Sequence, residues 1–250
     1  MEKQIRVAVA GAKGRMGQEV VKMLGDDAQL IFTGNLDTRG DEESIRLQME
    51  EMKPDVLVDF TTPHSVYRHM EICLQYGVRP VVGTTGLTPE QLQEMTDRYR
   101  EAGLGAIIAP NFAIGAILCM KFAALASKYM PHVEIIELHH DRKLDAPSGT
   151  ALKTAEMIAA VREERKQGHP EEKEIFAGAR GAEYEGFRIH SVRLPGMVAH
   201  QEVLFGAVGQ TLSIRHDSIS RESFMPGVNM AIKAVVNMNS LIYGLEHLID

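Results

Sequence analysis

The sequence contains no tryptophan, only two cysteines and no run of about 18 consecutive apolar residues. The cysteines, Cys73 and Cys119, lie in apolar helical patterns, which argues against a disulfide scaffold or a metal site and predicts buried free thiols in a reducing compartment. We expect no membrane span, and the charges of Glu2, Lys3 and Arg6 flank an apolar run too short for a signal peptide. We therefore expect a cytoplasmic protein that makes no contact with a membrane.

Basic residues are in the minority, with 27 Lys and Arg against 34 Asp and Glu, and the formal net charge is −7. This balance argues against nucleic acid as the general partner. An acidic ligand would have to be attracted by a local cluster of basic groups. With 250 residues, of which 44% are hydrophobic, the chain can bury the cores of two modest domains or of one large domain.

The amino-terminal segment has the order that is typical of a dinucleotide-binding fold. An apolar strand at 5–10 is followed by the glycines of GAKGRMG (11–17), a helix over 16–24, a second strand over 29–34 and then Asp37. The glycines allow a tight turn and a close approach of the backbone to a pyrophosphate, which the helix N-terminus stabilises. The spacing is G-x-x-G-x-x-G instead of the commoner G-x-G-x-x-G. The alternative is a structural turn without a ligand.

Four polar side chains bear on the choice of nicotinamide cofactor. Asp37 is placed to accept hydrogen bonds from the adenosine ribose, which favours NADH, and Arg39 is placed to pair with the extra phosphate of NADPH. Lys13 and Arg15 add positive charge near the phosphates. The sequence therefore predicts tolerance of both cofactors. The alternative for Arg39 is a charge on a solvated loop.

Strands and helices continue to alternate as far as residue 112, which predicts a parallel sheet with right-handed crossovers. The expected strands are 55–60, 79–82 and 106–109, and the expected helices are 65–76 and 88–102. The loops TTP (61–63), GTTG (83–86) and APNF (109–112) follow strands, at the sheet edge where ligands gather. We expect GTTG to approach the nicotinamide and its ribose, and Asn111 and Phe112 to lie near the nicotinamide or at a hinge. The alternative for each loop is an ordinary turn.

Beyond residue 112 the pattern changes to that of a second, α+β domain. The expected elements are helices at 114–129 and 151–161 and strands at 133–138, 188–194, 202–207 and 210–216. Short turns join the last two strands, so they should be antiparallel. The fold class is α/β: a Rossmann-type parallel sheet domain over 1–112 and 223–250, and a smaller α+β domain with a mixed, largely antiparallel sheet over 113–222. The return to the first domain is expected through a helix at 227–243.

Three features of the second domain leave alternatives open. The charged stretch 162–173 is most simply a solvated helix end and loop. The apolar alternation in 201–214 leaves one sheet face in need of cover, which an oligomer interface would provide. Arg193 and Arg215 fall within strands and are either interface or pocket charges.

The most informative stretch is ELHHDRKLDAPSGT (137–150), which places His139, His140 and Lys143 just before a Pro-Ser-Gly-Thr turn. Side chains alternate along a strand, so the two histidines should differ in role, and a group that titrates near neutrality can deliver a proton. Ser148 is a good N-cap, and the N–H groups that follow it stabilise a carboxylate or phosphate. The pattern favours a site for an acidic substrate; the alternative is a solvated loop and an ordinary helix cap.

Nearly the whole chain resembles the dihydrodipicolinate (4-hydroxy-tetrahydrodipicolinate) reductase family. The likeness runs through VAVAGAKGRMG, DFTTP, VVGTTGLT, APNFAIG, ELHHDRKLDAPSGTAL, RLPGMVAHQEVLFGAVGQTLSIRHDS and SRESFMPGV. The match over HHDRKLDAPSGTA is very specific, whereas the glycine turn alone is not. The resemblance implies reduction of the cyclic dicarboxylate 4-hydroxy-tetrahydrodipicolinate by NADPH or NADH, in lysine and diaminopimelate synthesis. It also implies a homotetramer joined through second-domain sheets.

The resemblance also implies residue roles. His139 matches the proposed proton donor and Lys143 the lysine that acts with it. Positions that bind the substrate carboxylates are matched by His140, Gly149 and Thr150, with Ser148 beside them. Cofactor contacts are matched by Gly11, Ala12, Lys13, Gly14, Arg15, Met16, Asp37, Gly83, Thr84, Thr85, Ala109, Pro110, Asn111 and Phe112.

One departure and two rival functions remain. Some family members carry Glu-Arg where this chain has Asp37-Thr38, so that the arginine is displaced to Arg39; this bears on the choice between NADH and NADPH. One rival is a nicotinamide enzyme that acts on amino or keto acids, such as an amino-acid dehydrogenase. The other is a non-catalytic dinucleotide-binding sensor, which would bind the cofactor without oxidising it.

Overall fold

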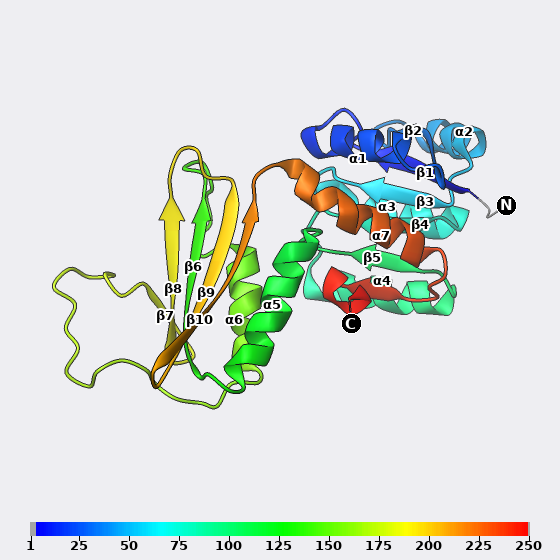
Figure 1. Cartoon of the computed structure of the whole chain (residues 1–250). Helices are drawn as coiled ribbons and strands as arrows, with labels where there is room; N and C mark the ends of the chain where they lie inside the picture. Colours follow the sequence, from blue (N-terminus) through cyan, green and yellow to red (C-terminus); the bar gives the residue numbers. More distant parts are fainter. Residues whose placement is uncertain (1–3, 250) are drawn as a thin grey trace. The chain divides into compact units, whose positions relative to one another are not determined.

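The amino-terminal strand and the glycine turn after it begin a unit in which strands alternate with helices and the strands form a parallel sheet (Figure 1). The structure, a computed structural model, describes residues 4–249. The chain divides into two compact units, one made of the chain up to Phe112 and from Arg221 onward, the other of Ala113–Ser220. None of the helices within 4–249 is long and apolar enough to cross a membrane.

Within the described residues, the sheet of the first unit has the strand order β11-β5-β4-β3-β1-β2, and every pairing in it is parallel. The strands are β1 (Ile5–Ala10), β2 (Leu30–Leu36), β3 (Val56–Asp59), β4 (Arg79–Val82), β5 (Ala106–Ile108) and β11 (Leu241–Tyr243). The chain passes from β1 outward to β2 and then returns to β3 on the other side of β1. The carboxyl ends of β1 and β3 therefore flank the point where the strand order reverses, which is where open α/β sheets bind ligands.

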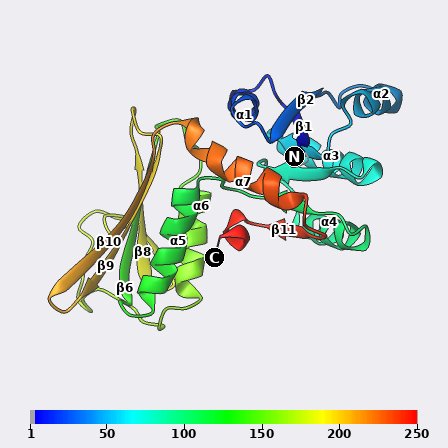
Figure 2. The same ribbon diagram turned by 45° about the vertical axis from the view of Figure 1, so that its right-hand side comes forward.

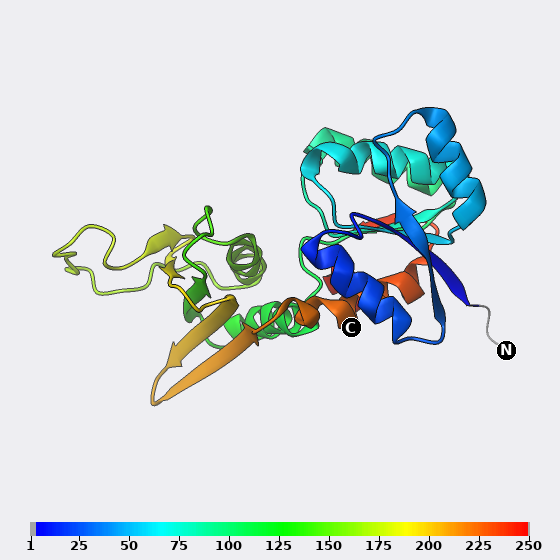
Figure 3. The ribbon, with the colours of Figure 1, turned by 90° about the horizontal axis from the view of Figure 1, so that it is seen from above.

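Helices cover both faces of this sheet, as the fully buried strand β3 requires. The helices are α1 (Arg15–Gly25), α2 (Glu42–Met52), α3 (Pro63–Tyr76), α4 (Pro89–Glu101) and α7 (Met225–Val235), with 3₁₀ turns at Arg221–Phe224 and Leu245–Leu248. Figure 3 shows α1 and α7 on one face and α2, α3 and α4 on the other. Apolar side chains of α2, α3 and α4 pack on the strands in two buried clusters.

The second unit has a mixed sheet with the order β10-β9-β6-β8-β7, in which only the β6–β8 pairing is parallel among the described residues. Its elements are α5 (Ile114–Ser127), β6 (His132–His139), α6 (Gly149–Ala159), β7 (Ala182–Tyr184), β8 (Phe187–Arg193), β9 (Ala199–Ala207) and β10 (Gln210–Ser218). Figure 2 shows α5 and α6 against one face of this sheet. The core between them is built from every second residue of the strands.

The parallel sheet, the mixed second sheet and the antiparallel β9–β10 pair confirm the predicted fold class. The predicted helix at 227–243 is wrong in its second half. α7 ends at Val235, and Leu241–Tyr243 instead forms β11 beside β5. A helix, α2, and a short strand, β7, lie where no element was expected, and β2 extends two residues further than predicted.

We expected the charged stretch after α6 to be solvated. This is wrong for Arg162, which is buried. Its guanidinium donates to the carbonyl oxygens of Pro131, Glu185 and Arg165 at 2.6, 3.0 and 2.9 Å. It also lies 5.3 Å from the centre of the Phe187 ring. Arg162 therefore anchors the start of this long loop to the sheet.

The apolar side chains that alternate along β9 and β10 face helices of the same chain. Val203 and Phe205 are buried against α5 and α6. Within the described part of this unit no helix covers the opposite face (Figure 2). That face carries ion pairs such as Arg215 with Glu202 and Asp217, so Arg215 is a charge of the uncovered face and not of a pocket.

Candidate active site

The glycine turn after β1 is built for close backbone contacts. A Cβ on Gly17 would lie 2.1 Å from the Gly11 oxygen and 2.7 Å from the Ala12 Cα. Gly11 itself has φ +82°, a conformation that favours glycine. The turn is held by a hydrogen bond of 2.9 Å from Gly14 N to Gly11 O, and by Ala12 N donating to Asn35 Oδ1 at 3.0 Å.

The start of α1 suits a pyrophosphate. Its N-cap is Gly14, which supplies no side-chain cap, so the first N–H groups of the helix have no partner from that residue. Lys13, Gly14 and Arg15 are exposed, and Met16 is half-buried. The open, glycine-lined helix start with two cations beside it fits a dinucleotide.

The ring of Phe60 joins the three loops that follow β3, β4 and β5. A Cβ on Gly83 would lie 2.0 Å from this ring, and the ring centre lies 5.8 Å from that of Phe112. The loops 61–63, 83–86 and 109–112 are thus brought together at the carboxyl edge of the sheet. Phe60 was not singled out by the sequence, although its place directly after β3 could have signalled it.

The predicted members of these loops differ in exposure. Ala109 and Phe112 are buried, at 1% exposure each, so their side chains belong to the core and only their backbone groups are suited to cofactor contact. The other members are half-buried or exposed: Gly83, Thr84, Thr85, Pro110 and Asn111.

Asp37 and Arg39 lie just after β2 and are bonded to each other. The Arg39 guanidinium donates to the two Asp37 carboxylate oxygens at 2.9 and 2.5 Å. Hydrogen bonds from the Arg39 side chain and backbone hold the pKa of Asp37 well below its usual range. The two residues predicted to recognise the adenosine end therefore form one exposed, charged unit.

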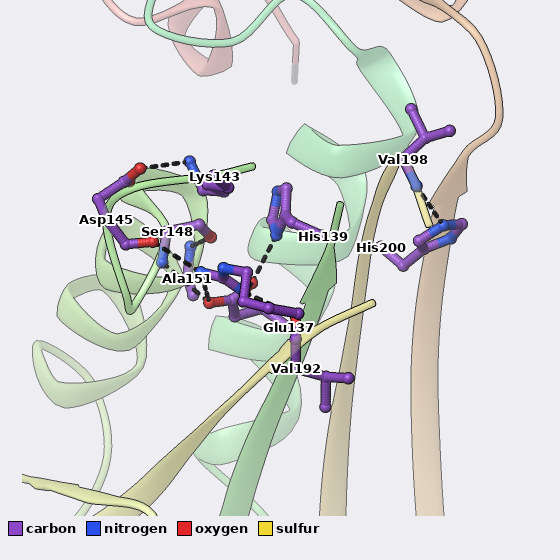
Figure 4. A network of polar contacts seen from close by, with 10 residues as sticks. Glu137, His139, Lys143, Asp145, Ser148, Ala151, Val192, Val198 and His200 are labelled. Carbon is purple, nitrogen blue, oxygen red and sulfur yellow. Dashed lines mark hydrogen bonds and ion pairs between the residues drawn. The ribbon is translucent and has the colours of Figure 1, made fainter. Parts of the chain in front are cut away.

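In the second unit, His139 ends β6 with its ring directed at Glu137 (Figure 4). Its Nδ1 lies 2.5 Å from Glu137 Oε2. A carboxylate only accepts, so Nδ1 carries a proton and Nε2 is the ring atom left for other partners. The His139 side chain is 13% exposed, whereas that of Glu137 is fully buried.

Glu137 connects the other residues of this site through hydrogen bonds. Arg193 on β8 donates to both of its oxygens, at 2.9 and 2.7 Å, and Ser148 N donates to it at 3.2 Å. Burial alone would raise the pKa of Glu137, but hydrogen bonds from His139, Arg193 and Ser191 lower it to about 2. Glu137 is therefore a carboxylate at neutral pH, and it accepts the hydrogen bond that orients the His139 ring.

The helix start at Ser148 is positioned by the same carboxylate. Ser148 Oγ accepts from Ala151 N at 3.2 Å, which confirms the predicted N-cap. Ser148 is only 3% exposed, so its hydroxyl is used for capping. Gly149 is exposed and Thr150 half-buried at the first two helical positions, where an anion is stabilised.

The loop between β6 and α6 holds the remaining basic groups. Lys143 Nζ pairs with Asp145 Oδ1 at 2.8 Å and is 21% exposed at its side chain (Figure 4). Arg193 also donates to the Asp145 carbonyl at 2.7 Å, which holds the loop against β8. His140 lies just beyond the strand and is exposed, so it is unlike His139 in surroundings, as predicted.

Sequence reasoning missed Glu137 and left the role of Arg193 open. The signal for Glu137 was present, because it follows Val133 and Ile135 at strand spacing and so shares their buried face. An acid in that position requires partners. Arg193 is one of them, so it is a charge of this site.

Two family descriptions together match almost the whole chain: "Dihydrodipicolinate reductase, N-terminus" over residues 5–112 and "Dihydrodipicolinate reductase, C-terminus" over residues 115–249. The 4-hydroxy-tetrahydrodipicolinate reductase of Halalkalibacterium halodurans is 57% identical over 98% of this chain and 100% of that protein. That of Bacillus subtilis is 54% identical over 98% of each.

Solved structures agree with this relationship. A dipicolinate-bound dihydrodipicolinate reductase from Paenisporosarcina sp. TG-14 has a TM-score of 0.90 and 52% identity, covering 98% of this chain and 100% of that one. An amine dehydrogenase from Mycobacterium smegmatis, with a TM-score of 0.62 and 15% identity over 98% and 96%, shares the fold alone. On the family matches and the full-length identities, the chain belongs to the dihydrodipicolinate reductase family.

Proposed function

We propose that this protein reduces 4-hydroxy-tetrahydrodipicolinate to tetrahydrodipicolinate, with NADPH or NADH as the reductant, in lysine and diaminopimelate synthesis. The observation that carries the proposal is the bonded chain Arg193–Glu137–His139 beside the helix start at Ser148. In this proposal His139 is the proton donor, and the helix start beside it binds an anionic group of the substrate. The relatives' name and the family matches support the reaction.

The first unit is the proposed cofactor-binding domain. The turn of Gly11–Gly17 and the start of α1 would hold the pyrophosphate, and the loops 83–86 and 109–112 would hold the nicotinamide side. When bound, the reduced nicotinamide supplies a hydride. Asp37 and Arg39 would contact the adenosine ribose of NADH or the phosphate of NADPH, which supports use of both.

The second unit is the proposed substrate-binding domain. The start of α6, at Gly149 and Thr150, would bind one carboxylate, with His140 and Lys143 supplying positive charge. This arrangement fits a dicarboxylate ring better than a neutral substrate.

His139 is the proposed proton donor. Loss of the 4-hydroxyl group as water converts the substrate to a conjugated imine. Addition of hydride to this imine leaves negative charge on the ring, and a proton from His139 Nε2 would neutralise it. Glu137 would orient the imidazole, and Arg193 would keep Glu137 ionised. Lys143 would serve in two roles, substrate binding and proton delivery.

We also propose a homotetramer in the cytoplasm. The uncovered face of the second-unit sheet supports association through that face, as the family resemblance implies (Figure 2). The free, buried thiols of Cys73 and Cys119 support a reducing compartment.

A coupled assay tests the reaction. Pyruvate, aspartate semialdehyde and the partner synthase generate the substrate, and loss of the near-ultraviolet absorbance of NADPH or NADH reports reduction. We expect oxidation of both cofactors that depends on the synthase. Oxidation of neither, while both still bind, would favour the sensor. Activity on an acyclic amino acid alone would favour an amino-acid dehydrogenase.

A further inference from the structure

A chain of hydrogen bonds runs through the core of the first unit between two of its carboxyl-edge loops. Thr38, in the loop after β2, bonds through Oγ1 to Nε2 of His69 on α3 at 2.6 Å. The other ring nitrogen of His69, Nδ1, lies 2.6 Å from Oδ2 of Asp59, the last residue of β3. Asp59 is fully buried and His69 is 3% exposed.

The second oxygen of Asp59 continues the chain to the next loop. Oδ1 accepts from Thr61 N at 2.8 Å and from Thr61 Oγ1 at 2.6 Å. Thr61 in turn lies beside the glycine turn, because a Cβ on Gly11 would meet the Thr61 Cγ2 at 3.1 Å. Asp59 and His69 therefore connect the Asp37–Arg39 loop to the loop that packs on the glycine turn.

The position of Thr38 relates these hydrogen bonds to the proposed cofactor site. Thr38 lies between Asp37 and Arg39, the two residues that face the adenosine end in the proposed function. The backbone of Asp37 is separately held by Gln48 of α2, which exchanges two hydrogen bonds of 2.9 Å with it. The Thr38–His69 bond is the second anchor of this short loop, from a different helix.

A purely structural role explains the buried Asp59–His69 pair poorly. Burying an ionisable pair costs free energy that apolar side chains of similar volume would avoid, so such a pair is weak evidence of a gain in stability. Asp59 is also the last residue of β3, at the edge where open α/β sheets bind ligands. The hydrogen bonds of the pair reach two loops of the proposed dinucleotide site.

We propose that His69 is a positioning residue for the cofactor. Held by Asp59, it fixes Thr38 and so preorganises the Asp37–Arg39 loop against the glycine turn, which reduces the ordering that binding requires. The inference rests on the proposed cofactor-binding role of the first unit. Because loop order serves both cofactors, NADPH and NADH should depend on His69 alike.

Direct titration of the full chain with NADPH and with NADH, without substrate, tests this inference. Thr38→Val removes one hydroxyl, and His69→Asn removes Nε2 while keeping an amide near the place of Nδ1. Each should raise both dissociation constants about threefold to tenfold, the effect of one hydrogen bond. The double variant should be no worse than either single one, because both remove the same bond. Thr38→Ser keeps a hydroxyl at this position, so it should bind both cofactors with the affinity of the unaltered protein.

Thr33→Val is the matched control, since Thr33 lies on β2 and its buried hydroxyl has no hydrogen-bond partner among the described residues. It should leave both dissociation constants unchanged. In the coupled assay, Thr38→Val should raise the KM for the cofactor and leave kcat at saturating cofactor unchanged.

The outcomes separate the two proposals. Failure of the unaltered chain to bind either cofactor would overturn the proposed function and this inference with it. Normal binding by Thr38→Val and His69→Asn, even with a lower free energy of unfolding, would overturn this inference alone. If His69→Asn does not fold, Thr38→Val decides the question by itself.

Discussion

At the scale of single residues, the candidate site depends on a carboxylate that no solvent reaches. Glu137 accepts hydrogen bonds from His139, Arg193 and Ser148 N, which together cover both of its oxygens. A buried charge is tolerated when it is fully hydrogen-bonded and paired in this way. The same contacts orient the ring of His139, the proposed proton donor, and hold the backbone of Ser148 at the start of α6 to the same carboxylate.

The stability of the protein should depend on pH through Glu137. The pKa of Glu137 is lowered from 4.5 to about 2 in the folded protein, so its stabilising contribution is complete above pH 4.5 and is lost as the pH falls towards 2. Glu137→Gln lacks this contribution at every pH. The free energy of unfolding of the native protein and of this variant can be measured with urea. The difference between the two should therefore become smaller as the pH falls from 4.5 towards 2. Parallel curves would contradict the assigned contacts.

Residue-level prediction succeeded where a pattern was local. Ser148 caps α6 as predicted, because an N-cap depends only on its neighbours. The alternation along β6 also separates His139 from His140. Arg193 could not be assigned from sequence because its partner, Glu137, is on another strand, 56 positions away.

At the scale of elements, the join of β1 and α1 depends on the absence of a side chain at Gly17. We predict that Gly17→Ala lowers the free energy of unfolding by about 3 kcal/mol or more, since the clash is with backbone atoms of Gly11 and Ala12 that cannot move aside easily. The affinity for NADPH should fall with it, because the turn would shift.

Gly25→Ala at the other end of α1 is the matched control. A Cβ there meets nothing within 4 Å, and alanine favours a helix by up to about 1 kcal/mol over glycine. It should leave stability equal or higher and cofactor affinity unchanged, as measured by urea unfolding and by titration. Equal behaviour of the two variants would refute the packing argument.

The elements that sequence missed were decided by contacts distant in the chain. The apolar pattern after residue 227 continues to 243, yet the helix stops at Val235 and Leu241 pairs with Ala106 of β5. Short strands of this kind take their conformation from the partner strand. α2 was different, because Asp41 caps it and its apolar face is readable, so its signal was local but was not used.

At the scale of the whole molecule, the sequence sufficed for the fold class and its parallel and antiparallel sheets, since these follow from element order. Arg162 shows where that reasoning fails. A charge in a charged stretch reads as solvated, but its hydrogen bonds go to carbonyls 31 and 23 positions away as well as nearby. Only the assembled sheet makes such a position buried.

Association through the uncovered face of the second-unit sheet yields a further prediction. Leu204 lies on that face of β9 and is 37% exposed. A charge at this position should weaken a tetramer interface, so Leu204→Glu should shift the sedimentation of the protein to smaller species. Leu212→Glu is the control, because Leu212 is 39% exposed but pairs with Phe205 and so lies on the helix-covered side. Sedimentation of the native protein as a monomer would contradict the proposal.

Steady-state kinetics of His139→Gln in the synthase-coupled assay test most directly whether His139 delivers the proton. His132→Gln, at the exposed start of the same strand, is the control and should behave as the native enzyme. We predict that kcat of His139→Gln falls about 10²- to 10⁴-fold, as expected for loss of a general acid, with little change in the KM for the dicarboxylate. An unchanged kcat with a raised KM would show that His139 only binds the substrate and would contradict this account.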